Sequence, residues 1–163
     1  MKRLVRARRR RRRPEPTLPP LEIEVRQRTV RLARARIRRA VAAARAQRPR
    51  RGGALSIALV DDRAIRRLHR DHLGLDSATD VLAFPLEGAP GGALGEVVAS
   101  AETARREAAA RGLAPDDELL LYVVHGVLHL LGFDDHAPAD RRRMRAAERK
   151  ALRAAGVSRN LFP

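Results

Sequence analysis

The chain has 163 residues and a formal net charge of +16 at pH 7, from 35 Lys and Arg against 19 Asp and Glu. This length suits one domain with its own hydrophobic core. No cysteine is present, which excludes disulfide scaffolds, thiolate metal sites and cysteine nucleophiles, so any metal must be held by His, Asp or Glu. No apolar run approaches the roughly 20 residues that cross a bilayer, and no apolar segment typical of a secretory signal follows the basic N-terminus. We therefore expect a cytoplasmic protein without a membrane partner.

Positive charge is concentrated at the N-terminus. Residues 1–20 hold nine basic side chains and one acid, which is half of the net charge. The run Arg8–Arg13 and the prolines that follow it predict a disordered, self-repelling arm, and residues 21–163 are expected to form the single domain. This domain is also basic, which favours a polyanionic partner, nucleic acid ahead of membrane. The strong preference for Arg over Lys has a neutral explanation as well, namely genomic base composition.

Alternating and helical patterns of apolar residues predict a mixture of strands and helices. In chain order the predicted elements are strand 21–25, helix 30–47, strand 55–60, helix 64–69, strand 81–84, strand 94–99, and helices 101–111, 115–131 and 138–155. Residues 88–92, which are rich in glycine, are a predicted flexible connection. The fold class expected from this order is a single α+β domain, with a mixed sheet of about four strands packed with helices.

The helix expected at 115–131 is apolar on almost every side. Pro115 lies in its first turn, and the three acidic residues that follow favour the positive end of the helix dipole. From Leu119 to Leu131 only two histidines interrupt the hydrophobic side chains, so this helix should be buried. Gly132 is expected to end it.

Three histidines within twelve residues form the candidate metal site. His125 and His129 are one turn apart on the buried helix and therefore share a face, and His136 follows the turn at Gly132. Buried imidazoles without partners cost about 1–3 kcal/mol each, although hydrogen bonds to the backbone would also satisfy them. Three neutral imidazoles on one Zn²⁺ satisfy them and leave a fourth position open, as in catalytic zinc sites. We favour this metal interpretation for the three histidines, whereas His69 and His72 are expected to be ordinary surface histidines.

Three segments of the chain carry a family resemblance. Residues 125–136 have the sequence His-Gly-Val-Leu-His-Leu-Leu-Gly-Phe-Asp-Asp-His, and upstream lie Thr-Asp-Val-Leu-Ala-Phe-Pro at 79–85 and Leu-Gly-Glu-Val-Val at 94–98. In content, order and spacing these segments resemble the YbeY family, bacterial single-domain metal-dependent endoribonucleases of rRNA maturation. The resemblance covers about residues 21–155.

The resemblance implies both a site and an activity. It implies that His125, His129 and His136 bind one Zn²⁺, and that the buried helix with its two histidines is zincin-like, in a fold related to the zinc proteases. It further implies cleavage of single-stranded RNA at the 3′ end of small-subunit rRNA, in ribosome biogenesis and quality control. The implied partners are single-stranded rRNA and the small ribosomal subunit.

Two departures from the family pattern affect the site. The third histidine of the family commonly follows the first by ten residues, whereas here the gap is eleven, with the pair Asp134-Asp135 where one Asp is usual. A turn can absorb the extra residue, so His136 is kept as the expected ligand. Leu73 stands where the family often carries an arginine thought to help catalysis. We therefore expect either that another arginine stabilises the negative charge of the transition state or that activity is low.

The expected chemistry is metal-assisted phosphodiester hydrolysis. The sequence identifies no catalytic base, and Asp134 and Asp135 suit three roles equally, namely orienting a ligand histidine, accepting a proton, or serving as turn acids. Two alternatives stay open. One is a non-catalytic, zinc-containing ribosome assembly or RNA-binding factor. The other is a zinc peptidase, which is less favoured because Gly126 stands where the His-Glu-x-x-His peptidases carry their catalytic glutamate.

Overall fold

The computed structural model describes residues 20–86, 92–157 and 161 of the chain. Almost all of the expected N-terminal arm (1–20) and of the predicted connection at 88–92 lies outside these residues. These described residues form four strands and five helices, and each strand and helix predicted from the sequence has its counterpart. They are β1 (Leu21–Val25), α1 (Arg34–Arg45), β2 (Leu55–Val60), α2 (Asp62–Leu73), β3 (Val81–Pro85), β4 (Gly95–Ser100), α3 (Ala101–Arg111), α4 (Pro115–Leu130) and α5 (Pro138–Ala154).

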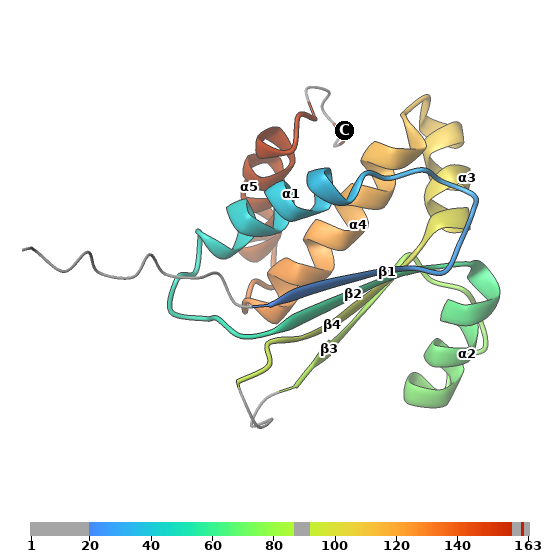
Figure 1. The fold of residues 1–163 in the computed structure, drawn as a ribbon, viewed down its shortest axis with the longest axis horizontal. Coiled ribbons are helices and arrows are strands. Elements are labelled where there is room, and N and C mark those ends of the chain that lie inside the picture. The colour runs from blue at the N-terminus through green and yellow to red at the C-terminus, as the bar shows by residue number, and fades with distance from the viewer. Residues whose placement is uncertain (1–19, 87–91, 158–160, 162–163) are drawn as a thin grey trace, which may run out of the picture.

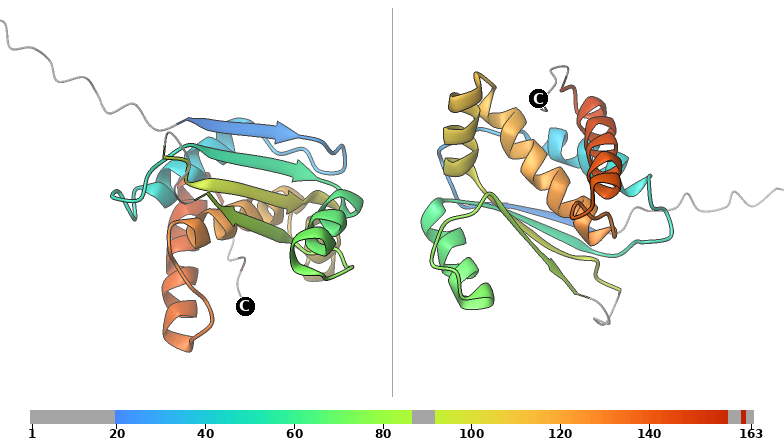
Figure 2. Two further views of the ribbon diagram at one scale, coloured as in Figure 1. Left: turned by 90° about the horizontal axis from the view of Figure 1, so that it is seen from below. Right: turned by 180° about the vertical axis from the view of Figure 1, so that it is seen from behind.

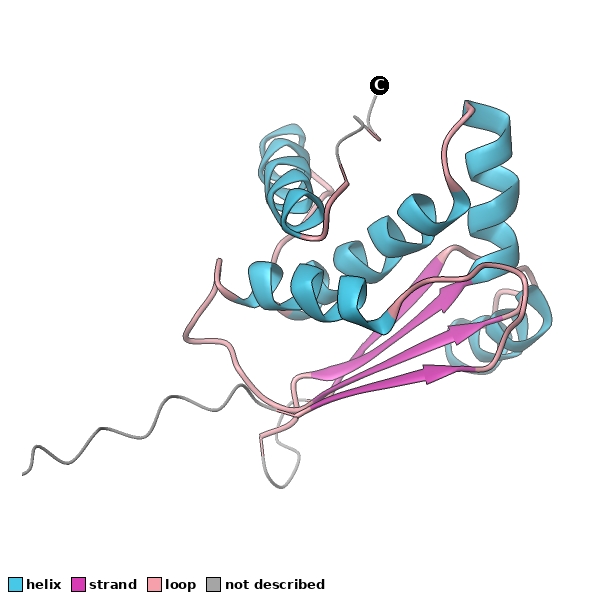
Figure 3. Ribbon diagram, turned by 45° about the horizontal axis from the view of Figure 1, so that its top comes forward, coloured by secondary structure: helices cyan, strands magenta, loops and turns pink. Residues whose placement is uncertain are grey.

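One four-stranded mixed sheet organises the molecule, with the strand order β1-β2-β4-β3. Strands β1, β2 and β4 are parallel, and β3 runs antiparallel to β4 with Val81 opposite Ala99. Helices α1, α3, α4 and α5 form a layer on one face of the sheet, whereas α2 lies on the other side, near the ends where β2 and β4 finish (Figures 1 and 3). The α+β class and the four-stranded mixed sheet predicted from the sequence are therefore confirmed.

The core follows from the apolar patterns of the central strands and of α4. Strands β2 and β4 are buried along almost their whole length, because side chains on alternate faces pack against the helical layer and against α2. Helix α4 buries ten of its sixteen residues, as expected for a helix that is apolar on nearly every side. The main core lies between the sheet and the helical layer, and a smaller cluster around Ile65 lies beneath α2.

Two helices differ in length from the sequence prediction. Helix α1 begins at Arg34 rather than at residue 30, because the Gln27 side chain accepts hydrogen bonds from the backbone N–H of Thr29 and Val30 at 2.7 and 2.9 Å and holds that segment in a turn. Val30 is still buried, but in the loop before the helix. Helix α2 begins at Asp62, where Asp61 caps it, and extends to Leu73, where Gly74 ends it with a left-handed backbone (φ +71°).

Candidate metal centre

The C-terminal half of α4 presents two imidazoles to one point. His125 and His129 lie one turn apart, with their Nε2 atoms 2.9 Å from each other and their ring planes at 83°. The helix ends soon afterwards, because Gly132 takes a left-handed backbone (φ +85°) and the N–H of Phe133 donates to the carbonyl of Leu128 at 3.0 Å. This turn brings the following loop back toward the histidines.

Asp135 completes the group from that loop. Its two carboxylate oxygens lie 3.7 Å from His125 Nε2 and 3.8 Å from His129 Nε2. One donor atom from each of the three residues lies within 4.8 Å of the others, and all three side chains are half-buried. Two imidazole nitrogens and a carboxylate oxygen are typical ligands of Zn²⁺ and of other divalent transition metals.

The facing nitrogens indicate that a cation or a proton belongs between them. The Nδ1 of His125 donates to Glu148 Oε1 at 2.7 Å, so the neutral form of His125 has its lone pair on Nε2, directed at His129. Two bare lone pairs at 2.9 Å would repel each other, and only one of the two rings can donate a proton to the other. The donor set therefore fits a metal ion chemically as well as geometrically.

Glu148 orients the first of these histidines. It lies on α5 and is 3% exposed. Burial by itself would lower the pKa of His125, but the hydrogen bond and charge of Glu148, together with Asp135, outweigh it and raise that pKa. Burial lowers the pKa of His129, and neighbouring His125 lowers it further. The sequence contains a signal for Glu148, since it interrupts the apolar stripe of Met144 and Leu152 on α5, but nothing in the sequence pairs it with His125.

His136, the third ligand expected from the sequence, lies beside this group rather than in it. Its side chain is 88% exposed and its Nδ1 contacts the Asp134 carboxylate. Asp134 also accepts a hydrogen bond from the backbone N–H of Asp135 at 2.7 Å. It therefore stabilises the turn, which is one of the three roles considered for it from the sequence. Asp134, Asp135 and His136 form a second possible donor group that shares Asp135 with the first. Position 135 is also the tenth after His125, the spacing at which the resemblance places a third histidine.

Position 126, where the zinc peptidases carry their catalytic glutamate, is closely packed against the sheet. A Cβ at this position would lie 2.8 Å from Val97 Cγ1 and 3.1 Å from Val81 Cγ2, because α4 packs directly on β3 and β4 there. Gly126 faces the sheet, so a side chain at 126 would force the helix and sheet apart. The structure therefore has no room for a catalytic glutamate at this position.

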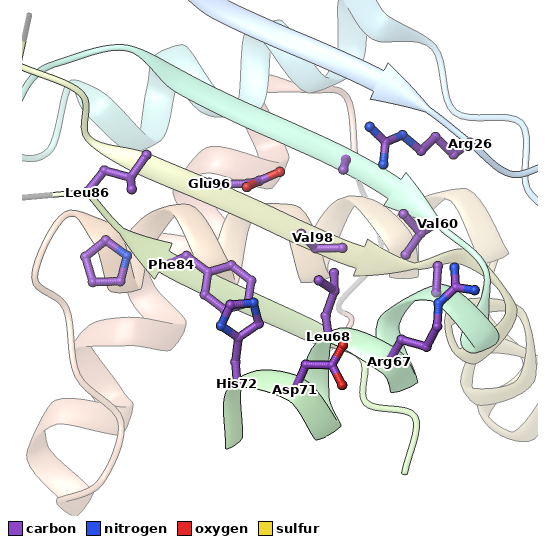
Figure 4. A pocket seen from close by; sticks show the side chains of 13 residues that line it. Arg26, Val60, Arg67, Leu68, Asp71, His72, Phe84, Leu86, Glu96 and Val98 are labelled. Carbon is purple, nitrogen blue, oxygen red and sulfur yellow. The ribbon is translucent and has the colours of Figure 1, made fainter. Parts of the chain in front are cut away.

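A separate cavity lies on the opposite face of the sheet. It has a volume of about 610 Å³ and is bounded by α2 and by the β-strands. Figure 4 shows Phe84 beside His72, whose ring centres are 4.9 Å apart, and Glu96 from β4. Glu96 and Val98 point into this cavity, whereas Val97 between them packs on Gly126 of α4. The histidine pair and this cavity are thus on different faces of the sheet.

The remaining histidines agree with their expected surface role. His69 contacts the carbonyl of Ser77 at 2.8 Å, and His72 packs on Phe84. Neither belongs to a possible metal-binding group within the described residues. Leu73, which stands where the family often has an arginine, is 60% exposed at the end of α2.

The fold and the donor group together define an α+β protein with a candidate His/His/Asp metal centre at the end of a buried helix. The family model described as endoribonuclease YbeY matches residues 22–156. The chain belongs to the YbeY endoribonuclease family. The family resemblance found in the sequence is thereby confirmed.

Relatives and a solved structure give the extent of the similarity. The endoribonuclease YbeY of Anaeromyxobacter sp. strain Fw109-5 is 48% identical over 118 residues, which are 71% of this chain and 62% of that protein. The endoribonuclease YbeY of Myxococcus xanthus is 47% identical over 111 residues, 65% of this chain and 38% of that protein. The chain therefore spans less than two thirds of the length of these relatives. The solution structure of a Thermotoga maritima protein matches with a TM-score of 0.57 and 23% identity, over 83% of this chain and 88% of that one, and shows a shared fold.

No helix among the described residues combines the length and apolar character that a membrane-spanning segment requires.

Proposed function

We propose that this chain is a single-strand-specific, metal-dependent endoribonuclease that acts in the maturation of the rRNA 3′ end and in ribosome quality control. Membership of the YbeY endoribonuclease family supports RNA as the substrate class, and the small ribosomal subunit is the setting that the sequence resemblance implies. The observation that carries the proposal is the convergence of His125, His129 and Asp135 on one point of a half-buried surface. A ribosomal substrate also agrees with the cytoplasmic location expected from the sequence.

Two histidines and one glutamate have separate roles in the proposed metal site. His125 and His129 would hold one Zn²⁺ through their Nε2 atoms, and Glu148 fixes the orientation of His125 from behind. A zinc ion at such a site supplies activation of water at neutral pH and polarisation of a phosphoryl oxygen. The side chains of His125 and His129 are 27% and 32% exposed, which leaves the site open to a substrate from the solvent side.

The loop at 134–136 supplies the third protein ligand. Asp135 already faces the histidines, whereas His136, the ligand expected from the sequence, would need the turn held by Asp134 to open. We therefore favour Asp135 and keep His136 as the alternative. The variant Asp135→Ala should weaken zinc binding more than His136→Ala, as measured by competition with a chromophoric chelator. The opposite order would assign the position to His136.

The decisive experiment combines metal analysis with RNA cleavage. The purified protein should contain about one zinc ion per chain and should cut a single-stranded fragment of the small-subunit rRNA 3′ end, and a chelator should abolish the cutting. The variant His129→Ala should lose cleavage while still binding the fragment. If metal-loaded wild-type protein binds this RNA without cutting it, the non-catalytic assembly factor replaces the nuclease.

A further inference from the structure

Helix α5 has an exposed side with charges of one sign. Beyond its first turn the only acid on this helix is Glu148, which is buried against His125. The exposed basic residues of the helix are Arg141, Arg142, Arg143, Arg145, Arg149, Lys150 and Arg153. The other acid of the helix is the partly buried Asp140 in the first turn, which pairs with Arg143 at 3.3 Å.

Four of these arginines form one ridge. Arg142, Arg145, Arg149 and Arg153 follow each other at spacings of three or four residues, so they share a side of the helix over about 16 Å. Within the described part of the chain, Arg142, Arg145 and Arg153 form no ion pair. Like charges at this spacing destabilise a helix unless an anion lies opposite them. A polyanion bound along the ridge would neutralise Arg142, Arg145 and Arg153, which have no ion-pair partner among the described residues.

Several arginines of the other helices pair with acids. On α2, Arg66 pairs with Asp76 at 2.8 Å, and on α3, Arg106 pairs with Asp62 at 3.1 Å. On α1, Arg36 pairs with two aspartates at the start of α4. The other arginines of α1 include Arg34, Arg38 and Arg39, which are exposed and form no ion pair within the described residues. What distinguishes α5 is the continuous row of four arginines at spacings of three or four residues, which α1 does not have.

The chemistry of the ridge favours phosphate over a lipid surface. The uncharged residues on the exposed side of α5 beyond the first turn are Ala146 and Ala154, so the helix has no large apolar side chain to insert among lipid tails. The planar guanidinium group binds phosphate through two hydrogen bonds. The chain has only three Phe and one Tyr, which favours contact with the backbone and shape of RNA over stacking on its bases.

The position of α5 connects this ridge to the metal centre. Its inner side contacts His125 through Glu148 at 2.7 Å, and a helix with its side chains is about 10–12 Å wide. The helix lies at the end of the helical layer opposite α3 in both views of Figure 2. At about 100° per residue the ridge lies roughly a quarter to a third of a turn around α5 from Glu148, so a polyanion on the ridge would lie on the flank of the helix that also carries the support of the candidate ligands.

We propose that the arginine ridge of α5 binds the phosphate backbone of a double-helical RNA segment that flanks the single strand to be cut. A straight, rigid row of cations suits the regular backbone of an A-form helix, which proteins recognise by shape and phosphate contacts. That the polyanion is RNA rests on the proposed function. The charge pattern itself stands independently of catalysis.

The test compares two variants that remove the same number of charges. The first is R142Q/R145Q/R149Q/R153Q on α5, and the control is R63Q/R66Q/R67Q/R70Q on α2, where all four positions are also exposed. Glutamine has a helix propensity similar to that of arginine, so circular dichroism and the melting temperature should verify that both variants fold. Binding is measured with chelator present, on an RNA hairpin with a single-stranded 3′ tail and on the tail alone, over a range of salt concentrations.

We expect the α5 variant to bind the tailed hairpin at least tenfold more weakly than wild type, with the tail alone and the α2 variant much less affected. The dependence of log K on log salt should flatten by about 0.9 for each phosphate that the variant no longer neutralises. Equal weakening in both variants, or equal weakening on the tail and the hairpin, would overturn the proposal. So would weaker binding to anionic vesicles with unchanged binding to RNA. Because binding is measured without cleavage, failure of the nuclease proposal would appear separately, as absent cutting by metal-loaded wild type.

Discussion

At the scale of single residues, the candidate centre depends on side chains that hold one another in place. His125 has one nitrogen on Glu148 and the other directed at His129, so its tautomer and its rotation are both fixed. Asp134 fixes the turn that presents Asp135. A carboxylate behind a ligand histidine is the arrangement that many zinc sites use to keep the metal-binding nitrogen deprotonated and aimed.

Loss of Glu148 should weaken metal binding. We expect Glu148→Gln and Glu148→Ala to raise the dissociation constant for zinc by about 10- to 100-fold, because the His125 ring loses its anchor. Competition with a chromophoric chelator measures this constant. The exposed Glu107→Gln on α3 is the matched control and should bind as wild type does. Unchanged zinc affinity in a folded Glu148→Ala protein would show that Glu148 has only a packing role.

At the scale of elements, two contacts set the positions of α4 and α2. Helix α4 approaches the sheet closely at Gly126, which leaves no space for a Cβ beside Val97. Helix α2 is joined to the start of α3 through Asp62, whose carboxylate accepts hydrogen bonds from Ser100 and Thr103. These contacts keep the helix that carries the histidines, and the helix on the opposite face of the sheet, at fixed positions on the sheet.

The close approach at Gly126 predicts a destabilised alanine variant. Alanine is the better helix former by about 1 kcal/mol, yet Gly126→Ala should lower the free energy of unfolding by about 1–3 kcal/mol, because the added methyl group overlaps Val97. Urea denaturation measures this change. Ala146→Gly on the exposed side of α5 provides a reference for propensity alone, with an expected loss of about 1 kcal/mol. A Gly126→Ala protein more stable than wild type would contradict the packing described.

Asp62 should make the free energy of unfolding depend on pH in the acid range. Burial opposes ionisation of this side chain, but hydrogen bonds from Ser100, Thr103 and Arg106 outweigh it and lower the pKa of Asp62. Its contribution is therefore complete above its usual pKa of about 3.9 and is lost as the pH falls through the lower folded value. Asp62→Asn should reduce the free energy of unfolding by about 1–3 kcal/mol at pH 7. In urea denaturation the difference from wild type should shrink toward pH 3, and a constant difference would count against this role.

At the scale of the whole molecule, the candidate centre joins parts of the chain that are distant in sequence. Helix α4 supplies two donors, the following loop the third, and α5 the supporting carboxylate. An ion bound there would link α4, α5 and the loop between them. Since only the folded chain brings these groups together, binding of the ion should stabilise the native state.

Metal should therefore raise the melting temperature. At a free zinc concentration about 100 times the dissociation constant, the stabilisation is about 2.7 kcal/mol, and a chelator should reverse it. Differential scanning fluorimetry with and without zinc measures the shift. His129→Ala should abolish the shift, whereas His72→Ala, on the other side of the sheet, should retain it. A full shift in His129→Ala would place the metal elsewhere.

The sequence by itself determined the features that depend on neighbours along the chain. The one-turn spacing put His125 and His129 on the same face of a helix, Gly132 ended that helix, and apolar periodicity identified all nine elements. The start of α1 was missed because it depends on the Gln27 side chain, whose hydrogen bonds to backbone N–H groups compete with the helix.

Only the tertiary structure decided which side chains meet across separate segments. In the structure Asp135 points toward the histidines and His136 toward solvent. The backbone conformation of the short loop sets these directions, and residue spacing does not predict that conformation. The tertiary structure also brought Glu148 to His125 and placed the cavity of α2 on the other face of the sheet. The physical reason is that periodicity records which way a side chain points from its own helix or strand, whereas a site depends on how those elements pack.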